Sequence, residues 1–140
     1  MKFTNNPLII FLLIMALAIS GCAVRNATDT RIFRDISTQE AAELIKDNES
    51  NPDFTMLDVR TPGEFKAGHI EGAINLDFYS ASFSDELAKL NRENTYFVYC
   101  SSGNRSGQAM KMMGSLGFNE VYNLSGGMSD WIADGFPVAE

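Results

Sequence analysis

The sequence predicts an α/β domain with a mostly parallel sheet, and three patterns support this fold class. Short apolar or β-branched runs alternate along the chain with amphipathic segments of helical period. The loops between them are short. The run at residues 54–60 is apolar at most positions, as expected of a strand buried on both faces of a sheet. Such alternation is typical of helices packed on a parallel sheet, whose functional loops lie at the carboxyl ends of strands.

Two helix-starting signals flank this strand. Ser37-Thr38-Gln39-Glu40 is a capping box followed by apolar residues on one helical face, which predicts a helix that ends near Asn48. Thr61-Pro62-Gly63-Glu64 is a second capping box with proline at the first helical position. It predicts a short helix that is capped by Gly68.

The second half of the chain continues the alternation. In chain order, the predicted elements are a short strand near residues 74–76, a helix at 84–90, a strand at 95–99, a helix at 106–116, a strand at 120–124 and a last helix that opens at 126–127. Gly117 closes the second of these helices, and residues 135–137 end the fold.

The N-terminus has the composition of an export signal. Lys2 precedes an apolar run at residues 8–19 that is too short to span a bilayer comfortably, and small residues follow the run. Leu17-Ala18-Ile19-Ser20-Gly21-Cys22 resembles a bacterial lipobox, in which the cysteine is lipidated and becomes the first mature residue. The alternative is ordinary signal cleavage nearby, with Cys22 left as a free thiol.

The lipobox resemblance implies a division of the chain and a location. Residues 1–21 are expected to be a lipoprotein signal peptide, residues 22–34 a lipidated N-terminus and polar tether, and residues 35–140 the folded domain. Ala23, in place of aspartate, resembles the second mature residue of outer-membrane lipoproteins. We therefore expect the domain to face the periplasm, anchored to the outer membrane.

The charge and the composition exclude several classes of function. The net charge is −7 at pH 7, and removing residues 1–21 takes away one lysine and no acidic residue. An acidic surface argues against nucleic-acid binding and against electrostatic attachment to anionic lipid, so membrane contact is expected through acyl chains. With His69 as the only histidine and Cys100 as the only domain thiol, we expect no metal site, no cofactor and no internal disulfide.

The loop from Cys100 to Arg105 is the strongest candidate site. It lies between a predicted strand and a predicted helix, so backbone N–H groups and the helix N-terminus are expected to surround the sulfur. This environment, with an adjacent arginine, predicts a partly ionised and nucleophilic thiol. A buried structural cysteine is the alternative, and the polar residues Ser-Ser-Gly-Asn-Arg that follow Cys100 argue against it.

The spacing within this loop discriminates between two chemistries. Cysteine-dependent protein phosphatases have five residues between cysteine and arginine, a loop wide enough to surround phosphate. Four residues separate Cys100 from Arg105, and this smaller loop better fits a terminal sulfur carried on the cysteine. A thiol–disulfide enzyme is disfavoured because the chain has no Cys-x-x-Cys pair.

On these residues the chain resembles the single-domain rhodaneses, a family of sulfurtransferases. The matching segments occur in family order, at residues 57–60, 64–75, 100–105 (Cys-x-x-Gly-x-Arg) and 124–131. The resemblance covers residues 33–138 and implies a central, mostly parallel sheet of about five strands with helices on both faces. It also implies that Cys100 takes up a sulfane sulfur as a persulfide and passes it to a thiophilic acceptor, as in thiosulfate:cyanide sulfurtransferases.

The same resemblance assigns roles within the loop. The Cys100 thiolate is expected to attack the outer sulfur of a donor such as thiosulfate in a two-step, ping-pong reaction. The backbone N–H groups of residues 101–106 (Ser101, Ser102, Gly103, Asn104, Arg105 and Ser106) are expected to cradle the anionic persulfide. Arg105 either holds the thiolate and orients an anionic donor or forms a salt bridge that shapes the loop. The hydroxyls of Ser101 and Ser102 have two possible roles: they form hydrogen bonds to the Cys100 sulfur or to the sulfur donor, or they are simply solvated as part of the loop.

Two charged residues and the histidine lie outside the loop. Asp58 and Arg60, at a strand end, are expected to brace neighbouring loops, with a place for Arg60 in the pocket as the alternative. His69 is expected to belong to the scaffold, because persulfide transfer needs no general base.

The sequence does not identify the sulfur donor or the sulfur acceptor. Neutral Ser101 and Ser102 make the loop less basic than that of thiosulfate-specialised members, so a persulfide or polysulfide is an alternative donor. With no second domain thiol, the acceptor must be external: cyanide, a small thiol or a partner protein. A non-catalytic rhodanese module, which binds a partner or carries sulfur passively, is the alternative function.

Overall fold

The computed structural model describes residues 30–140. The predicted signal peptide at residues 1–21, the predicted lipidation site Cys22 and residues 23–29 of the predicted tether lie outside the described residues. Within the described range, no helix is long and apolar enough to cross a bilayer.

A parallel five-stranded sheet forms the centre of the described region, in the order β1-β5-β4-β2-β3. The strands are β1 (Ile32–Ile36), β2 (Phe54–Asp58), β3 (Ile74–Asn75), β4 (Thr95–Tyr99) and β5 (Glu120–Leu124). The central strand β4 is buried from Tyr96 onward. This sheet confirms the predicted fold class.

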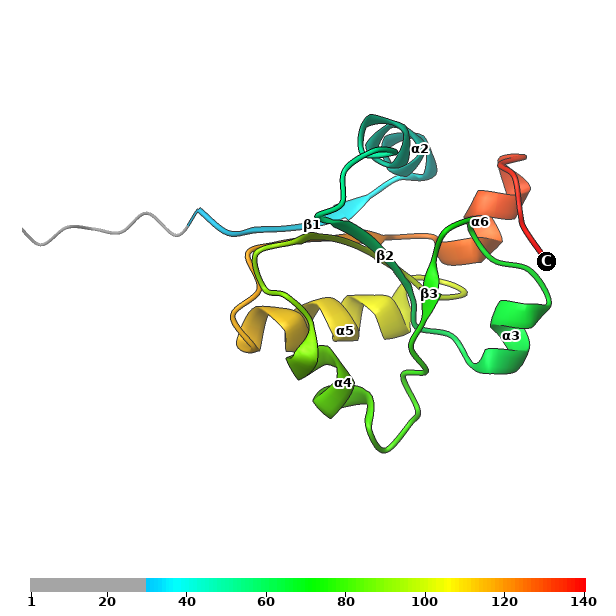
Figure 1. The fold of residues 1–140 in the computed structure, drawn as a ribbon. Helices are drawn as coiled ribbons and strands as arrows, with labels where there is room; N and C mark the ends of the chain where they lie inside the picture. Colours follow the sequence, from blue (N-terminus) through cyan, green and yellow to red (C-terminus); the bar gives the residue numbers. More distant parts are fainter. Residues whose placement is uncertain (1–29) are drawn as a thin grey trace, which may run out of the picture.

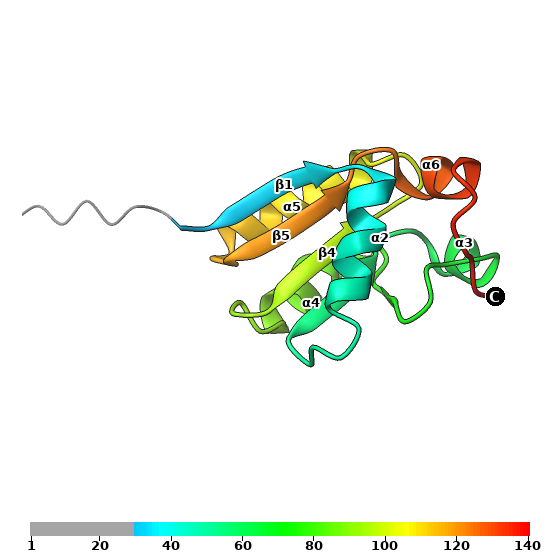
Figure 2. The ribbon, with the colours of Figure 1, turned by 90° about the horizontal axis from the view of Figure 1, so that it is seen from above.

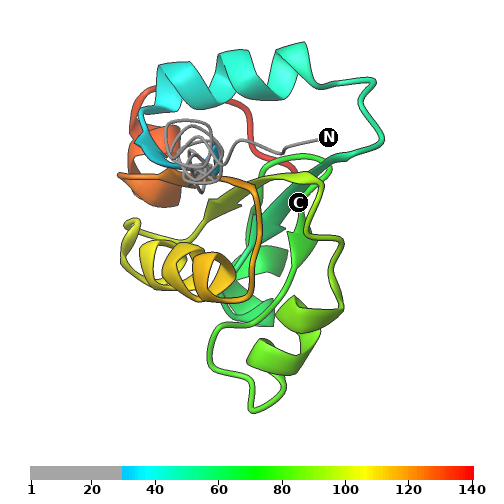
Figure 3. The ribbon, with the colours of Figure 1, turned by 90° about the vertical axis from the view of Figure 1, so that its left-hand side faces the viewer.

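In residues 30–140, five helices pack around the sheet, which forms the middle layer (Figure 1). They are α2 (Thr38–Asp47), α3 (Pro62–Lys66), α4 (Phe83–Lys89), α5 (Asn104–Ser115) and α6 (Gly127–Ala133). Helix α2 covers one face, and α4 and α5 cover the other (Figures 1 and 3). Figure 2 looks onto the first face and shows α2 crossing over the strands. The short helices α3 and α6 lie at the carboxyl ends of the strands (Figure 1).

Strand β4 contributes side chains to a hydrophobic cluster on each face. Tyr96 and Val98 belong to the cluster that includes Ala109 and Met113 of α5, whereas Phe97 and Tyr99 belong to the cluster on the α2 face. Successive strand residues point to opposite faces, so an uninterrupted apolar run is what a doubly covered strand requires. The two covered faces therefore explain the apolar pattern of residues 95–99.

The helix starts follow the capping residues in the sequence. Both capping boxes are formed: the side chains of Ser37 and Thr61 accept hydrogen bonds from the backbone N–H groups of Glu40 and Glu64. The carboxylates of Glu40 and Glu64 in turn accept hydrogen bonds of 2.8 and 2.9 Å from the backbone N–H groups of Ser37 and Thr61. Helix α2 ends at Asp47, next to the predicted stop at Asn48.

The N-terminal boundary differs from the prediction. Residues 32–34, predicted to belong to the tether, form the start of β1 and pair with residues 120–122 of β5. Strand β1 lies at the sheet edge, and only Ile36 of its five residues is buried. An exposed edge strand carries no apolar run, which is why the sequence pattern does not reveal it.

Helix α5 also begins earlier than predicted. It starts at Asn104, two residues before the predicted start at Ser106, because Gly103 forms its N-cap with a positive φ of 88°. Asn104 and Arg105 therefore lie in the first turn of a helix, whereas the sequence assigns them to a loop.

Candidate active site

Cys100 follows directly on the last residue of β4, at the carboxyl end of the central strand. The chain then turns through Ser101 and Ser102 to Gly103, the N-cap of α5. A Cβ at Gly103 would lie 2.0 Å from the carbonyl oxygen of Ser125, so only glycine fits this turn. The turn folds the backbone N–H groups at the start of α5 back toward the Cys100 sulfur.

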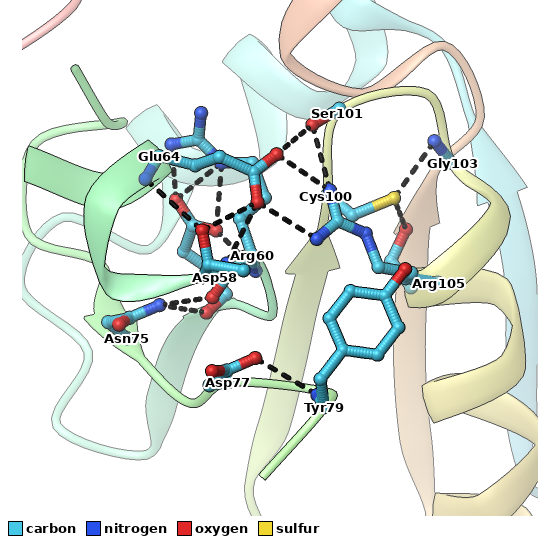
Figure 4. Close-up of polar contacts among 12 residues, drawn as sticks. Asp58, Arg60, Glu64, Asn75, Asp77, Tyr79, Cys100, Ser101, Gly103 and Arg105 are labelled. Carbon is cyan, nitrogen blue, oxygen red and sulfur yellow. Dashed lines mark hydrogen bonds and ion pairs between the residues drawn. The ribbon is translucent and has the colours of Figure 1, made fainter. Parts of the chain in front are cut away.

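The Cys100 sulfur is buried and hydrogen-bonded. Its Sγ accepts from the backbone N–H of Gly103 at 3.2 Å and from the hydroxyl of Ser106 at 3.4 Å (Figure 4). Burial alone would raise the pKa of the Cys100 thiol. The hydrogen bonds from the Ser106 hydroxyl and from the N–H groups of Ser106, Ser102 and Gly103 outweigh burial and lower that pKa.

The direction of this pKa shift separates a reactive cysteine from a structural one. A cysteine enclosed only by apolar groups has a raised pKa and stays a thiol. Cys100 is 1% exposed, yet its thiolate is stabilised by directed donors. The arrangement is that of an anion nest at the start of a helix.

The start of helix α6 forms hydrogen bonds to the backbone of the Cys100 loop. The N–H of Met128 donates to the carbonyl of Cys100 at 2.8 Å, and that of Ser129 donates to the carbonyl of Ser101 at 3.0 Å. Gly127 has a φ of 60°, and a Cβ there would lie 2.5 Å from the carbonyl oxygen of Cys100. This close approach requires glycine at position 127, where the start of α6 lies against the loop.

The Arg105 side chain is engaged by a carboxylate. Its guanidinium donates two hydrogen bonds to Glu64, of 2.9 and 2.8 Å, and a third to the Ser101 hydroxyl at 2.9 Å (Figure 4). The guanidinium also lies over the ring of Tyr79, 5.4 Å from its centroid. Of the two roles weighed for Arg105, this geometry is that of the salt bridge that shapes the loop.

The other polar loop side chains are turned to different partners. The Ser101 hydroxyl donates to Glu64 at 2.7 Å. Ser102 and Asn104 are exposed, and the Asn104 side chain accepts from Gln108 at 2.8 Å. Ser106, whose backbone alone was expected to contribute, also supplies the hydroxyl that contacts the sulfur.

Asp58 and Arg60 form a buried ion pair that braces a loop. The Arg60 Nε lies 3.0 Å from each Asp58 carboxylate oxygen, and Arg60 also donates to the carbonyl of Gly68 at 2.6 Å. The Asn75 amide donates to the carbonyls of both Asp58 and Arg60. These contacts connect the end of β2 to β3 and to the loop after α3.

His69 lies in this braced loop. Its Nδ1 donates to the carbonyl of Phe65 at 3.1 Å, and its ring stacks on Phe65 with centroids 3.9 Å apart. Its backbone pairs with Ala139. These are scaffold contacts. Among residues 30–140, no group of three or more histidine, cysteine or acidic side chains could hold a metal ion.

Glu64 is the site residue that sequence reasoning missed. The sequence identifies it as part of a capping box and as the first residue of a family-matching segment, but not as a partner of Arg105, which lies 41 positions away. The two meet because β2 and β4 are neighbours in the sheet, so the segments after these strands lie side by side. No local pattern carries that information.

Comparisons with known proteins agree with this geometry. The family model for the rhodanese-like domain matches residues 37–134. A thiosulfate sulfurtransferase (GlpE) of Ectopseudomonas mendocina is 35% identical over 101 residues, which are 72% of this chain and 86% of that protein. A sulfurtransferase of Allochromatium vinosum is 29% identical over 107 residues, 76% of this chain and 95% of that protein.

A solved structure is similar as well. The crystal structure of a rhodanese-related protein from Thermoplasma volcanium superposes with a TM-score of 0.64 at 35% identity, covering 76% of this chain and 97% of that one. The sheet, the Cys100 loop and these matches together lead to one conclusion: the chain belongs to the rhodanese-like domain family.

Proposed function

We propose that this protein is an exported, lipid-anchored sulfurtransferase that carries a sulfane sulfur on Cys100. Family membership and the sulfurtransferase relatives support sulfur transfer in general. The observation that carries the proposal is the set of hydrogen-bond donors on the Cys100 sulfur, which lowers the pKa of a buried thiol.

In the first half-reaction, the Cys100 thiolate attacks the outer sulfur of thiosulfate. The sulfur–sulfur bond of thiosulfate breaks, its electron pair leaves with sulfite, and Cys100 becomes an anionic persulfide. The same donors that stabilise the thiolate, from Gly103 and the start of α5, are then available to the persulfide.

In the second half-reaction, an external nucleophile takes the sulfur. Cyanide or a thiolate attacks the outer persulfide sulfur, the Cys100 sulfur leaves as a thiolate, and thiocyanate or a new persulfide is released. Cys100 is the free cysteine of the described residues, so the acceptor comes from outside this domain. A partner protein that presents a thiol is one such acceptor.

The test is thiosulfate:cyanide transfer by the purified full-length protein in detergent, beside the Cys100→Ser variant. We expect wild type to form thiocyanate and to show, in intact-mass spectra, the gain of one sulfur atom. Cys100→Ser keeps Cys22 and is therefore the matched control for adducts on the other cysteine. If both proteins are inert and neither gains sulfur from any sulfane donor, the domain is a non-catalytic module.

The export and the lipid anchor rest on the N-terminal sequence pattern. Lys2, the apolar run at residues 8–19 and the lipobox-like segment ending at Cys22 support them. We expect globomycin, which blocks lipoprotein signal cleavage, to cause an unprocessed precursor to accumulate in cells. Normal processing in its presence, or a Cys22→Ser variant that still fractionates with the outer membrane, would contradict the anchor.

A further inference from the structure

Glu64 joins the Cys100 loop to helix α3 through both of its carboxylate oxygens. Oε1 accepts from Arg105 at 2.8 Å and from the Ser101 hydroxyl at 2.7 Å. Oε2 accepts from Arg105 at 2.9 Å and from the N–H and hydroxyl of Thr61, both at 2.9 Å. The carboxylate is therefore held between two elements, and its position is set from both sides.

This contact neutralises the charge of Arg105. The hydrogen bonds from Arg105 hold the pKa of Glu64 well below its usual range, with further lowering from Ser101 and Thr61, against an opposing effect of burial. The Glu64 carboxylate in turn raises the pKa of Arg105. Both groups stay ionised at neutral pH, so the pair beside Cys100 carries no net charge.

The guanidinium is also largely covered. The side chain of Arg105 is 14% exposed and that of Glu64 34% exposed. The ring of Tyr79, which is itself 69% exposed, stacks against the guanidinium. An anionic donor that approaches Cys100 thus meets an arginine whose charge and hydrogen bonds are already taken up by a carboxylate.

We propose that Glu64 is a specificity-determining residue that makes the site discriminate against doubly charged sulfur donors. By neutralising Arg105, it weakens the attraction for a dianion such as thiosulfate relative to a donor with one negative charge. This inference rests on the proposed function, because it concerns the donor from which Cys100 takes its sulfur.

Two donors of the same chemistry test the proposal. Thiosulfate carries two negative charges, and methanethiosulfonate carries one. Each gives its outer sulfur to the Cys100 thiolate, one releasing sulfite and the other methanesulfinate. The ratio of their kcat/KM values therefore reports the response of the site to one unit of donor charge.

Glu64→Gln is the informative variant. Glutamine retains the capping-box role, since glutamate and glutamine both serve at that position, but it frees the charge of Arg105. We expect the kcat/KM ratio of thiosulfate to methanethiosulfonate to rise on the order of tenfold, mainly through a lower KM for thiosulfate. A residue that only maintains the fold would lower activity toward both donors alike.

Glu40→Gln is the matched control. Glu40 has the same place in the capping box of α2, on the sheet face away from α5 (Figure 1). We expect its donor ratio to equal that of wild type. An unchanged ratio in folded Glu64→Gln, or an equal change in Glu40→Gln, would overturn the proposal.

A measurement on wild type covers the case in which Glu64→Gln does not fold. With Arg105 neutralised, we expect the KM for thiosulfate not to rise between low and high ionic strength. A steep rise with salt would show that the arginine attracts the dianion, which would contradict the proposal. If neither donor adds sulfur to Cys100 of wild type by intact mass, the proposed function itself is wrong, and the role of Glu64 in donor choice is wrong with it.

Discussion

At Cys100 the pKa of the thiol results from two opposing effects. Burial disfavours the thiolate, and the hydrogen bonds from Ser106, Ser102 and Gly103 favour it more strongly. The hydroxyl of Ser106 is the one side-chain donor among these groups. It can therefore be removed without changing the backbone that forms the rest of the nest.

Replacing Ser106 by alanine should raise the pKa of Cys100 by about one unit, because a hydrogen bond to a charged acceptor is lost. The measurement is the pH dependence of Cys100 alkylation by iodoacetamide, followed on the Cys100 peptide by mass spectrometry. Its midpoint should move to higher pH. Ser102→Ala is the control, since only the backbone of Ser102 contributes to the shift. Equal midpoints for wild type and Ser106→Ala would contradict the account of the nest.

At the scale of elements, the junction of β4 and α5 depends on the conformation of one residue. Gly103 adopts a φ of 88° to cap α5 and lies against the backbone of residues 124–125. A side chain at this position is strained by the left-handed conformation and collides with the Ser125 carbonyl. The same residue donates its N–H to the sulfur, so the turn and the site form together.

Gly103→Ala should lower the free energy of unfolding by about 2–4 kcal/mol. Gly63→Ala is the matched control, because Gly63 lies in α3 with no neighbour within 4 Å of an added Cβ and no positive φ. The control should be neutral or slightly stabilising, as expected for alanine in a helix. Urea unfolding of wild type and the two variants measures these free energies. A Gly103→Ala variant as stable as wild type would rule out the close approach of residue 103 to the Ser125 carbonyl.

The end of β2 is held to its neighbours by a buried ion pair. Asp58 is fully buried and Arg60 nearly so, and Arg60 extends the pair to the carbonyl of Gly68. A buried pair contributes little net stability, but removing one partner leaves an uncompensated charge. The loop after α3 therefore depends on Asp58 and Arg60 being present together.

Arg60→Met should destabilise the protein by about 3–5 kcal/mol, because the Asp58 carboxylate is then buried without its partner. The double variant Asp58→Leu/Arg60→Met should recover part of that loss, since no charge is then left unpaired. Thermal unfolding of the single and double variants measures both changes. If Arg60→Met unfolds at the temperature of wild type, the pair does not brace the loop.

At the scale of the whole molecule, the sheet order decides which loops meet. Because β2 lies beside β4, the helix that follows β2 and the loop that follows β4 share one edge. Glu64 and Arg105 connect these two segments. The low pKa of Glu64 thus makes the stability of the fold depend on pH.

Glu64 should stabilise wild type at neutral pH relative to Glu64→Gln, and this advantage should shrink in acid. Its folded pKa lies below its ordinary value of 4.5, so its contribution is full above that value. It is lost as pH falls through the lower folded pKa. Chemical unfolding of wild type and Glu64→Gln between neutral and acidic pH measures how the difference in their free energies of unfolding changes with pH. A difference that is constant, or that grows toward acid, would contradict the assignment.

Much of this protein follows from its sequence alone, because the responsible interactions are local. The capping boxes of α2 and α3, the strands β4 and β5, and the hydrogen bonds on the Cys100 sulfur each depend on residues within a few positions of one another. Only the tertiary structure decided the partners of Arg105, the pairing of the exposed edge strand β1 and the choice of the Gly68 carbonyl as a partner of Arg60. Those contacts join segments brought together by the sheet order, and no spacing along the chain encodes them.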